Sequence, residues 1–297
     1  MRRKKLIVIV GPTASGKSEL AVKIAKQTGG EIISADSRQV YKGLDIGTAK
    51  ITKKEMGGVK HYCLDIASPK KHLTVVDWKK CAEEATTTIY RSGKIPIVVG
   101  GTMFYIKALT EGWTLPEVPS NLKLRKKLDK KSAKELFKML RKKDPARART
   151  IEPKNKRRLI RALEIIAALG KVPKLKKDPP AGGKYDATFI GIRRSPEELK
   201  KRLKKRTHEM LKKGLLKEIK KLRASGLSWK RFYELGFEYK YPALYLQKKI
   251  SSDDMKKMLL KENLDYVRRQ MVWLKKEKRI RWIRPSLPTF SFLSTDK

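Results

Sequence analysis

Residues 11–18 hold the side chains best suited to phosphate chemistry, in the order Gly-Pro-Thr-Ala-Ser-Gly-Lys-Ser. The run matches the P-loop pattern G-x-x-x-x-G-K-S in full. Its glycines let amide N–H groups turn inward, Lys17 supplies a cation, and the Ser18 hydroxyl suits Mg²⁺. A chance match in a loop without a ligand is the alternative, and the motif does not by itself indicate ATP. The residues expected to bind a diphosphate are Gly11, Pro12, Thr13, Ala14, Ser15, Gly16, Lys17 and Ser18, with the metal near Ser18.

The sequence on either side of this loop has the character that a P-loop needs. Five aliphatic residues at 6–10 predict a strand that is buried on both faces, as at the centre of a parallel sheet. Apolar residues between 20 and 25 fall on one face of a helix. The positive end of that helix dipole favours an anion in the loop.

Two further strands end in polar residues. An apolar run at 31–35 ends at Asp36, and another at 95–99 ends in Gly-Gly-Thr at 100–102. Because the carboxyl ends of parallel strands line the ligand crevice, we expect Asp36 and Thr102 beside the P-loop. A carboxylate there can coordinate Mg²⁺ or act as a base. A helix cap or turn is the alternative for Asp36, and a plain tight turn is the alternative for 100–102.

Residues 118–184 differ from the rest in charge and pattern. They hold 23 Lys and Arg against 6 Asp and Glu and contain no strand-like run. Helical spacing recurs at 122–128, 133–142 and 155–169. The sequence therefore predicts an all-helical insertion at 118–184 in a discontinuous α/β core formed by 1–117 and 185–297.

The last of these helices carries a basic face. Arg158 and Arg161 share that face, while Leu159 and neighbouring apolar residues turn inward. Arginines on such a face suit phosphate contacts. A merely solvated basic surface is the alternative.

Periodicity predicts further elements in the core. These are a loop at 42–60, strands at 61–66, 187–193 and 280–283, and helices at 73–91, 103–109, from 196 towards 214, 215–224 and 255–278. The aromatic-rich stretch at 229–245 suits either the core or stacking on bases.

The whole chain of 297 residues is strongly basic, with 74 Lys and Arg against 30 Asp and Glu. Such a field attracts polyanions, and nucleic acid is the first candidate, although a lysine-rich background is the alternative. Cys63 and Cys81 indicate neither a disulfide framework nor a metal set, and favour a reducing cytoplasm. No apolar run approaches the roughly 20 residues that would span a bilayer, so no membrane partner is expected.

Together, the motifs resemble tRNA dimethylallyltransferases. They are GPTASGKS at 11–18, DSRQVY at 36–41, DIGTAK at 45–50, GGT at 100–102, RLIRALE at 158–164 and RQMVW at 269–273. The resemblance runs in order over roughly residues 5 to 284. The sequence departs from the family in two ways. The stretch at 235–238 matches the family's Gly-Tyr pattern loosely, and the eukaryotic zinc-finger extension is absent, so the resemblance implies a bacterial-type enzyme.

The resemblance implies a P-loop NTPase-like parallel sheet with a helical insertion that clasps the tRNA anticodon stem-loop. The family moves a dimethylallyl group from dimethylallyl diphosphate to the exocyclic amine of the adenosine just 3′ of the anticodon. The base must leave the stack to react. Mg²⁺ is the implied cofactor, and we expect a cytoplasmic monomer.

The resemblance also assigns roles. Asp36 is the implied general base, Thr102 orients the adenine amine, and Arg206 faces the leaving diphosphate. The residues implied in tRNA contacts are Asp36, Ser37, Arg38, Gln39, Thr102, Arg125, Arg157, Arg158, Leu159, Ile160 and Arg161.

Three other functions stay open on the sequence. A P-loop kinase of a nucleotide or small molecule would share the loop, but has little need for a cationic insertion. An enzyme that prenylates free adenine nucleotides would not need the insertion either. An RNA-binding module with an inactive P-loop would not need Lys17, Ser18, Asp36 and Thr102 together.

Overall fold

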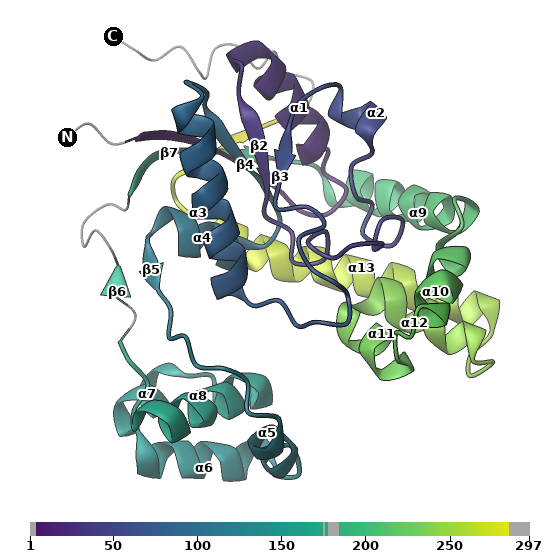
Figure 1. Cartoon of the computed structure of the whole chain (residues 1–297). Coiled ribbons are helices and arrows are strands. Elements are labelled where there is room, and N and C mark those ends of the chain that lie inside the picture. Colours follow the sequence, from purple (N-terminus) through teal and green to yellow (C-terminus); the bar gives the residue numbers. More distant parts are fainter. Residues whose placement is uncertain (1–3, 175, 178–183, 285–297) are drawn as a thin grey trace. The chain divides into compact units, whose positions relative to one another are not determined.

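The computed structural model describes residues 4–174, 176–177 and 184–284 (Figure 1). The chain divides into two compact units, Met1–Gly112 with Gly182–Lys297, and Trp113–Ala181. We name them the core unit and the helical unit. The helical unit begins before residue 118, where the sequence placed the boundary.

The core unit is built on a six-stranded parallel sheet, which confirms the predicted P-loop NTPase-like α/β fold. The strands are β1 (Lys4–Val10), β2 (Glu31–Ser34), β3 (His61–Tyr62), β4 (Pro96–Gly100), β7 (Tyr185–Ile192) and β8 (Ile280–Ile283). Their order across the sheet is β3-β2-β4-β1-β7-β8, and all paired neighbours are parallel. The strand before the P-loop, β1, therefore lies inside the sheet between β4 and β7.

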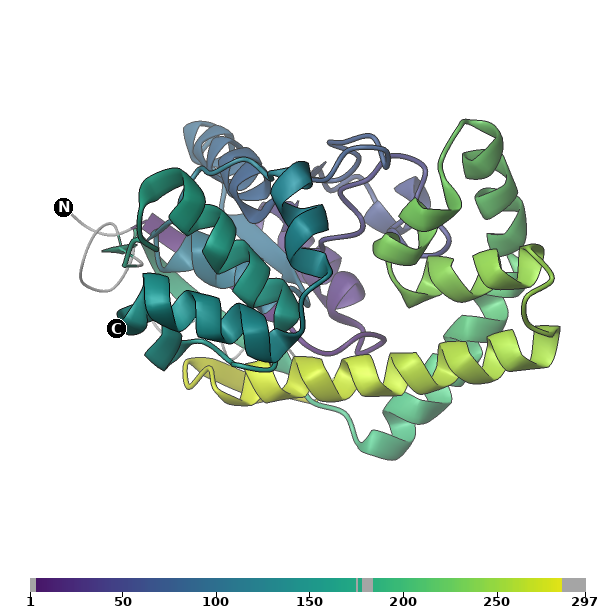
Figure 2. The ribbon, with the colours of Figure 1, turned by 90° about the horizontal axis from the view of Figure 1, so that it is seen from below.

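Nine helices belong to the described part of the core unit. They are α1 (Lys17–Thr28), α2 (Lys53–Met56), α3 (Val75–Arg91), α4 (Met103–Thr110), α9 (Pro196–Lys212), α10 (Leu215–Ala224), α11 (Trp229–Leu235), α12 (Phe237–Leu246) and α13 (Ser252–Lys275). The long helix α13 packs against α9 (Figure 2). Val267 of α13 contacts Leu199 and Leu203 of α9 there.

Helices cover both faces of the sheet because β1 is apolar on both sides. Successive residues of a strand point to opposite faces. Ile7 and Ile9 pack with the apolar face of α1, whereas Leu6, Val8 and Val10 pack with residues of α3 and α4. The loop that follows β1 is therefore held on a strand buried from both sides.

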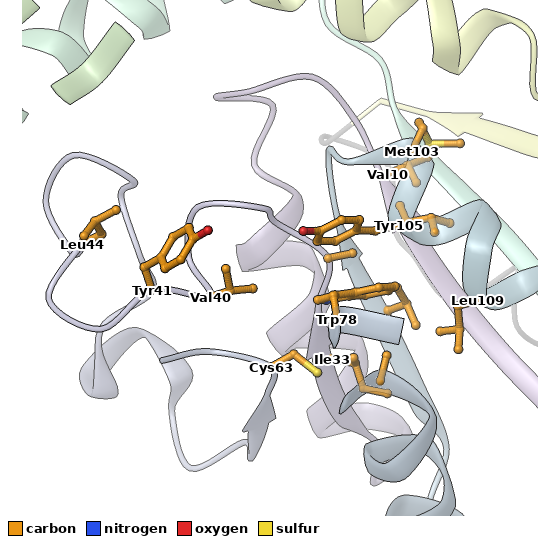
Figure 3. Packing of buried hydrophobic residues seen from close by; sticks show 14 of the residues in the cluster. Val10, Ile33, Val40, Tyr41, Leu44, Cys63, Trp78, Met103, Tyr105 and Leu109 are labelled. Carbon is orange, nitrogen blue, oxygen red and sulfur yellow. The ribbon is translucent and has the colours of Figure 1, made fainter. Parts of the chain in front are cut away.

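The face of the sheet under α3 and α4 holds the larger core (Figure 3). Trp78 is fully buried there and stacks on Tyr105 with ring centroids 4.6 Å apart. Its Nε1–H donates to the carbonyl of Ser34 at 2.9 Å, so the buried donor is satisfied. This contact ties α3 to the end of β2, two residues before Asp36.

The structure corrects two predictions for the core and decides between the alternatives for a third. The segment expected as a loop at 42–60 contains the short helix α2, which Thr52 caps through a capping box. The third strand ends at Tyr62 because Cys63 and Asp65 adopt the left-handed backbone, with φ of 59° and 55°. The stretch at 229–245 forms α11 and α12 and its aromatics include core residues, as one of the two interpretations held.

The helical unit packs four helices around its own apolar core. They are α5 (Leu122–Asp129), α6 (Ala133–Lys143), α7 (Pro145–Thr150) and α8 (Lys156–Leu169). The prediction of no strand in this segment is wrong at β6 (Lys176–Lys177), which pairs antiparallel with β5 (Trp113–Thr114). Helix α7 was not predicted; Asp144 caps it by accepting the Arg147 N–H at 2.9 Å.

A buried carboxylate organises the helical unit. The Glu164 side chain is fully buried on α8. It accepts the Asn121 N–H at 2.9 Å and two bonds of 2.8 Å from the Arg125 guanidinium. These bonds fix the start of α5 on α8.

No helix in the described ranges is both long and apolar enough to cross a bilayer.

Candidate active site

The P-loop backbone bends where small residues permit it. Gly16, the N-cap of α1, has φ of 99°, and Ala14 has φ of 65°. Both angles lie in the left-handed region, which costs glycine little and strains alanine. A Cβ at Gly11 would lie 2.6 Å from Ser15 Oγ, so the loop closes as it does because Gly11 lacks a side chain.

Two amides of the loop already have protein partners. The Thr13 N–H donates to Gln270 Oε1 at 2.9 Å, and the Ser15 N–H donates to Pro12 O at 3.2 Å. The Ser15 side chain is fully buried. For Thr13 and Ser15, the predicted contact of the amide with phosphate therefore requires these bonds to break. The first amides of α1 have no partner within the helix, and amides at this position are suited to binding an anion.

Lys17 is held among charged groups of the loops around it. Its Nζ donates to Pro12 O at 3.4 Å. Burial lowers the pKa of Lys17 to about 8, the nearby Asp36 carboxylate opposes this shift, and Arg206 adds to it. The structure thus brings together three residues that the sequence placed at one site.

Asp36 follows β2 and lies at the same sheet edge as the P-loop. Its Oδ1 accepts the Arg38 N–H at 2.8 Å and the Gln39 N–H at 3.4 Å. This is the turn-forming role that the sequence left open as an alternative. The same bonds fix the direction of the carboxylate, so the turn and a chemical role are compatible.

Thr102 is joined to the loop that carries Asp36. Its Oγ1 accepts the Ser37 N–H at 3.3 Å, and its own N–H donates to Ala35 O at 3.3 Å. A Cβ at Gly100 would overlap the backbone of Ala35, so β2 and β4 can end this close together only with glycine there. Asp36 and Thr102 are therefore neighbours at one edge.

The loop at 45–50 reaches the site because Glu218 of α10 holds it. The Glu218 carboxylate accepts three consecutive amides, those of 45–47, at 2.6 to 3.1 Å. The carbonyl of Thr48 in this loop accepts bonds of 3.4 Å from Gln39 Nε2 and from Arg206 Nη2. This carbonyl orients the guanidinium that the sequence assigned to the leaving group.

Sequence reasoning missed two arginines that support the P-loop from outside. Arg194 Nε donates to Ser15 O at 2.7 Å, and Arg202 Nε donates to Ala14 O at 2.6 Å. Arg202 lies one helical turn before Arg206 on α9, and that four-residue spacing is the signal that could have found it. Their charges add to the positive potential around the loop.

Glu238 adds a carboxyl group near these charges. Burial raises its pKa to about 7, against the opposing effects of Arg206 and Arg38. It lies in the stretch at 235–238 that departs from the family pattern. Because this pKa is about 7, Glu238 gains or loses its charge near neutral pH, and this changes the net charge beside Asp36.

The remaining residues that are expected to contact tRNA lie in the helical unit, where some are exposed and others are buried. Arg157 and Arg158 are exposed on α8. Leu159 and Ile160 are buried in the unit's core, and their contact with tRNA stays a prediction that their side chains do not support. Arg161 donates to Val118 O at 2.8 Å, and Arg125 pairs with Glu164 as described above. Both guanidinium groups remain only half-buried.

The donor set at the site suits a magnesium ion that is bound largely through a ligand. Within the described ranges, no group of three or more His, Cys, Asp or Glu side chains is placed to hold a metal. Mg²⁺ in phosphate sites usually has one or two protein ligands and takes the rest from phosphates and water. An exposed hydroxyl at Ser18, in the first turn of α1, fits that chemistry.

A parallel sheet with a P-loop after its inner strand β1, flanked by an aspartate and several arginines, defines a protein of the P-loop class. The family follows from comparison with known proteins. The model of the IPP transferase family matches residues 39–277. The chain belongs to this family.

Individual relatives agree over most of the chain. It is 36% identical to the tRNA dimethylallyltransferase of Halothermothrix orenii, over 95% of this chain and 88% of that protein. The solved structure of a tRNA isopentenylpyrophosphate transferase from Bacillus halodurans is 34% identical, with a TM-score of 0.71, and the match covers 95% of this chain and 90% of that one. A eukaryotic dimethylallyltransferase, solved acting on tRNA, has a TM-score of 0.80 at 29% identity, over 95% of this chain and 74% of that one.

Proposed function

We propose that this chain transfers a dimethylallyl group from dimethylallyl diphosphate to the exocyclic amine of the adenosine 3′ of the anticodon in tRNA, releasing diphosphate. One observation supports this proposal most strongly: Lys17 lies near Asp36 at one edge of the sheet, and Thr102 is hydrogen-bonded to the loop that carries Asp36. The names of the relatives support the same reaction, and they favour it over a P-loop kinase.

The P-loop and its arginines act on the donor. As the allylic C–O bond breaks, negative charge grows on the departing diphosphate. Lys17, Arg206 and the first amides of α1 are cations and donors that interact more strongly with this charge as it grows, so they stabilise the transition state more than the bound donor. Mg²⁺ held near Ser18 would neutralise further charge on the diphosphate.

Asp36 and Thr102 act on the acceptor. An aryl amine is a weak nucleophile, so removing its proton as the C–N bond forms lowers the barrier. We assign that proton to Asp36 Oδ2, because Oδ1 is engaged by the turn amides. The Thr102 hydroxyl, which accepts the Ser37 N–H, can donate its own proton to the adenine and orient it.

The helical unit supplies a surface for the RNA. Exposed Arg157 and Arg158 on α8 suit phosphates of the anticodon stem-loop. The same surface argues against a free adenine nucleotide as acceptor, since a mononucleotide has no need of it.

One assay separates the candidate reactions. The purified chain is incubated with Mg²⁺ and dimethylallyl diphosphate, and with either tRNA carrying adenosine 3′ of the anticodon or AMP. A parallel reaction contains ATP and no prenyl donor. Prenylated tRNA is the expected product. Prenylated AMP, or phosphoryl transfer from ATP without prenyl transfer, would contradict the proposal.

A further inference from the structure

Gln270 is a buried amide that connects two loops of the candidate site. It lies on α13 with 6% of its surface exposed. Its Oε1 accepts the Thr13 N–H of the P-loop at 2.9 Å, and its Nε2 donates to the Gly101 carbonyl at 3.4 Å. Gly101 immediately precedes Thr102.

The chain leaves space for this contact at Gly101. A Cβ there would overlap Gln270 Nε2, and the same Cβ would lie 3.7 Å from the Gly11 carbonyl. The P-loop and the loop after β4 therefore approach each other closely, and the side chain of Gln270 contacts both. Only a residue without a side chain at 101 allows the amide to reach both.

An amide is the side chain that this position requires. One end must accept a backbone N–H and the other must donate to a backbone carbonyl, and a glutamine does both without a charge. A carboxylate would lose the donor and place a negative charge beside an anion-binding loop. An apolar side chain of the same length would leave both backbone groups unpaired.

Helix α13 gives Gln270 a rigid base. Val267, one turn earlier, packs with Leu199 and Leu203 of α9. Leu274, one turn later, is fully buried in the larger core. Helix α13 therefore fixes the position of the Gln270 amide, and the hydrogen bonds of this amide hold the two loops to the helix.

We propose that Gln270 is a positioning residue that fixes the donor-binding loop relative to the loop that carries Thr102. This rests on the proposed function, in which the P-loop holds the prenyl diphosphate and Thr102 orients the amine. In-line displacement needs the allylic carbon and the amine nitrogen aligned, and a misplacement of about 1 Å costs on the order of 100-fold in rate. Gln270 sets that alignment without touching either substrate.

The test compares Gln270→Met with a matched control on the same helix. Asn263 is 4% exposed, and among the described residues its side chain bonds within α13, its Nδ2 donating to Leu259 O at 2.9 Å. For Gln270→Met we expect kcat to fall about 10- to 100-fold, with the affinity for tRNA unchanged. Asn263→Leu removes an equally buried amide and should keep kcat within about threefold of wild type. Equal losses of kcat in both variants, or a Gln270→Met enzyme with wild-type kcat, would overturn the proposal.

A double-mutant cycle tests the contact itself. Gly101→Ala places a methyl group against the amide, so alone it should lower kcat about as much as Gln270→Ala. In the Gln270→Ala background the methyl group has room, and Gly101→Ala should cost little more. Losses that multiply in the double variant would show that the two positions act independently.

Amide hydrogen exchange reads the loops without any reaction. Gln270→Met should speed exchange in peptides covering 11–18 and 100–102 about tenfold or more, while Asn263→Leu leaves them unchanged. If wild-type protein transfers no prenyl group but the exchange result holds, the proposed function fails and the loop-fixing role of Gln270 stands. Unchanged exchange in both segments would overturn that role whatever the activity.

Discussion

The lowered pKa of Lys17 makes donor binding depend on pH in a range that is easy to assay. Burial brings this pKa to about 8 from an ordinary value of 10.5. Lys17 is therefore largely charged at pH 7, and only about one-tenth of it is charged at pH 9. If the diphosphate binds the charged form, kcat/KM for dimethylallyl diphosphate should be level up to about pH 8 and then fall about tenfold per pH unit.

The assay follows kcat/KM for the donor from pH 6 to 9.5 with saturating tRNA. Lys17→Arg is the control, because a guanidinium stays charged throughout this range. Its profile should lack the fall above pH 8, whatever its absolute rate. Glu238, with a pKa raised to about 7, titrates nearby, so Glu238→Gln separates any change between pH 6 and 7.5 from that of Lys17. A wild-type profile level to pH 9.5, or an arginine variant that falls in parallel with wild type, would refute the reasoning.

The same shift predicts an effect on stability. Between pH 8 and 10.5 the unfolded chain binds more protons at Lys17 than the folded chain, so this residue makes stability rise with pH in that window. Below pH 8, the burial of the charge costs about 1 to 3 kcal/mol, after allowing for its partial contact with water. Lys17→Met should therefore melt at a higher temperature than wild type at pH 7, and the difference should shrink by pH 10 in thermal unfolding.

Further predictions concern the acceptor side, the helical unit, the sheet and the RNA. Asp36→Ala should lose about 100- to 10,000-fold in kcat while binding tRNA normally; an equal loss of binding in a filter assay would contradict its role as base. Glu164→Gln should destabilise the helical unit by about 2 to 4 kcal/mol, because the Arg125 guanidinium loses its charged partner, and thermal melting would show it. Gly100→Ala should lower the yield of folded protein, because its methyl group would overlap the Ala35 backbone; a wild-type melting temperature would count against this. The logarithm of tRNA affinity should fall linearly with that of salt, with a slope of about −0.7 to −0.9 per phosphate neutralised, whereas a flat series would argue against a binding surface made by the basic charge.

The sequence predicted most of the site where local chemistry decides local structure. The P-loop needs its glycines, its lysine and an apolar strand before it, and all three are visible within one short stretch. Asp36 and Thr102 were predicted because each directly follows a buried strand. The parallel arrangement of such strands then brings their ends to one edge.

Other parts of the site depend on contacts between distant residues, which periodicity does not reveal. Gln270 lies 257 positions from Thr13 along the chain, and nothing in the spacing of its helix links the two residues. Glu218 looks like one more charged residue on α10, yet its carboxylate holds three amides of another loop. The two-residue strand β6 is made of lysines and exists only through its pairing with β5.

The prediction for the basic helix α8 combined the spacing of its residues with a motif resemblance. Its spacing placed Leu159 on the inner face, and the structure buries it. Motif resemblance nevertheless carried Leu159 and Ile160 into the set of tRNA contacts. A motif marks a stretch of chain, whereas burial decides which of its side chains can meet a partner.

The position of β1 between β4 and β7 has a consequence for how the chain is made. On one side of β1, its partner β4 is synthesised before the helical unit. On the other side, its partner β7 is synthesised only after the helical unit. Until then the nascent chain carries an aliphatic strand with one edge unpaired, a surface that attracts chaperones and other chains. An mRNA truncated before the codon for residue 184 should therefore yield a fragment that is degraded, and not a shortened enzyme.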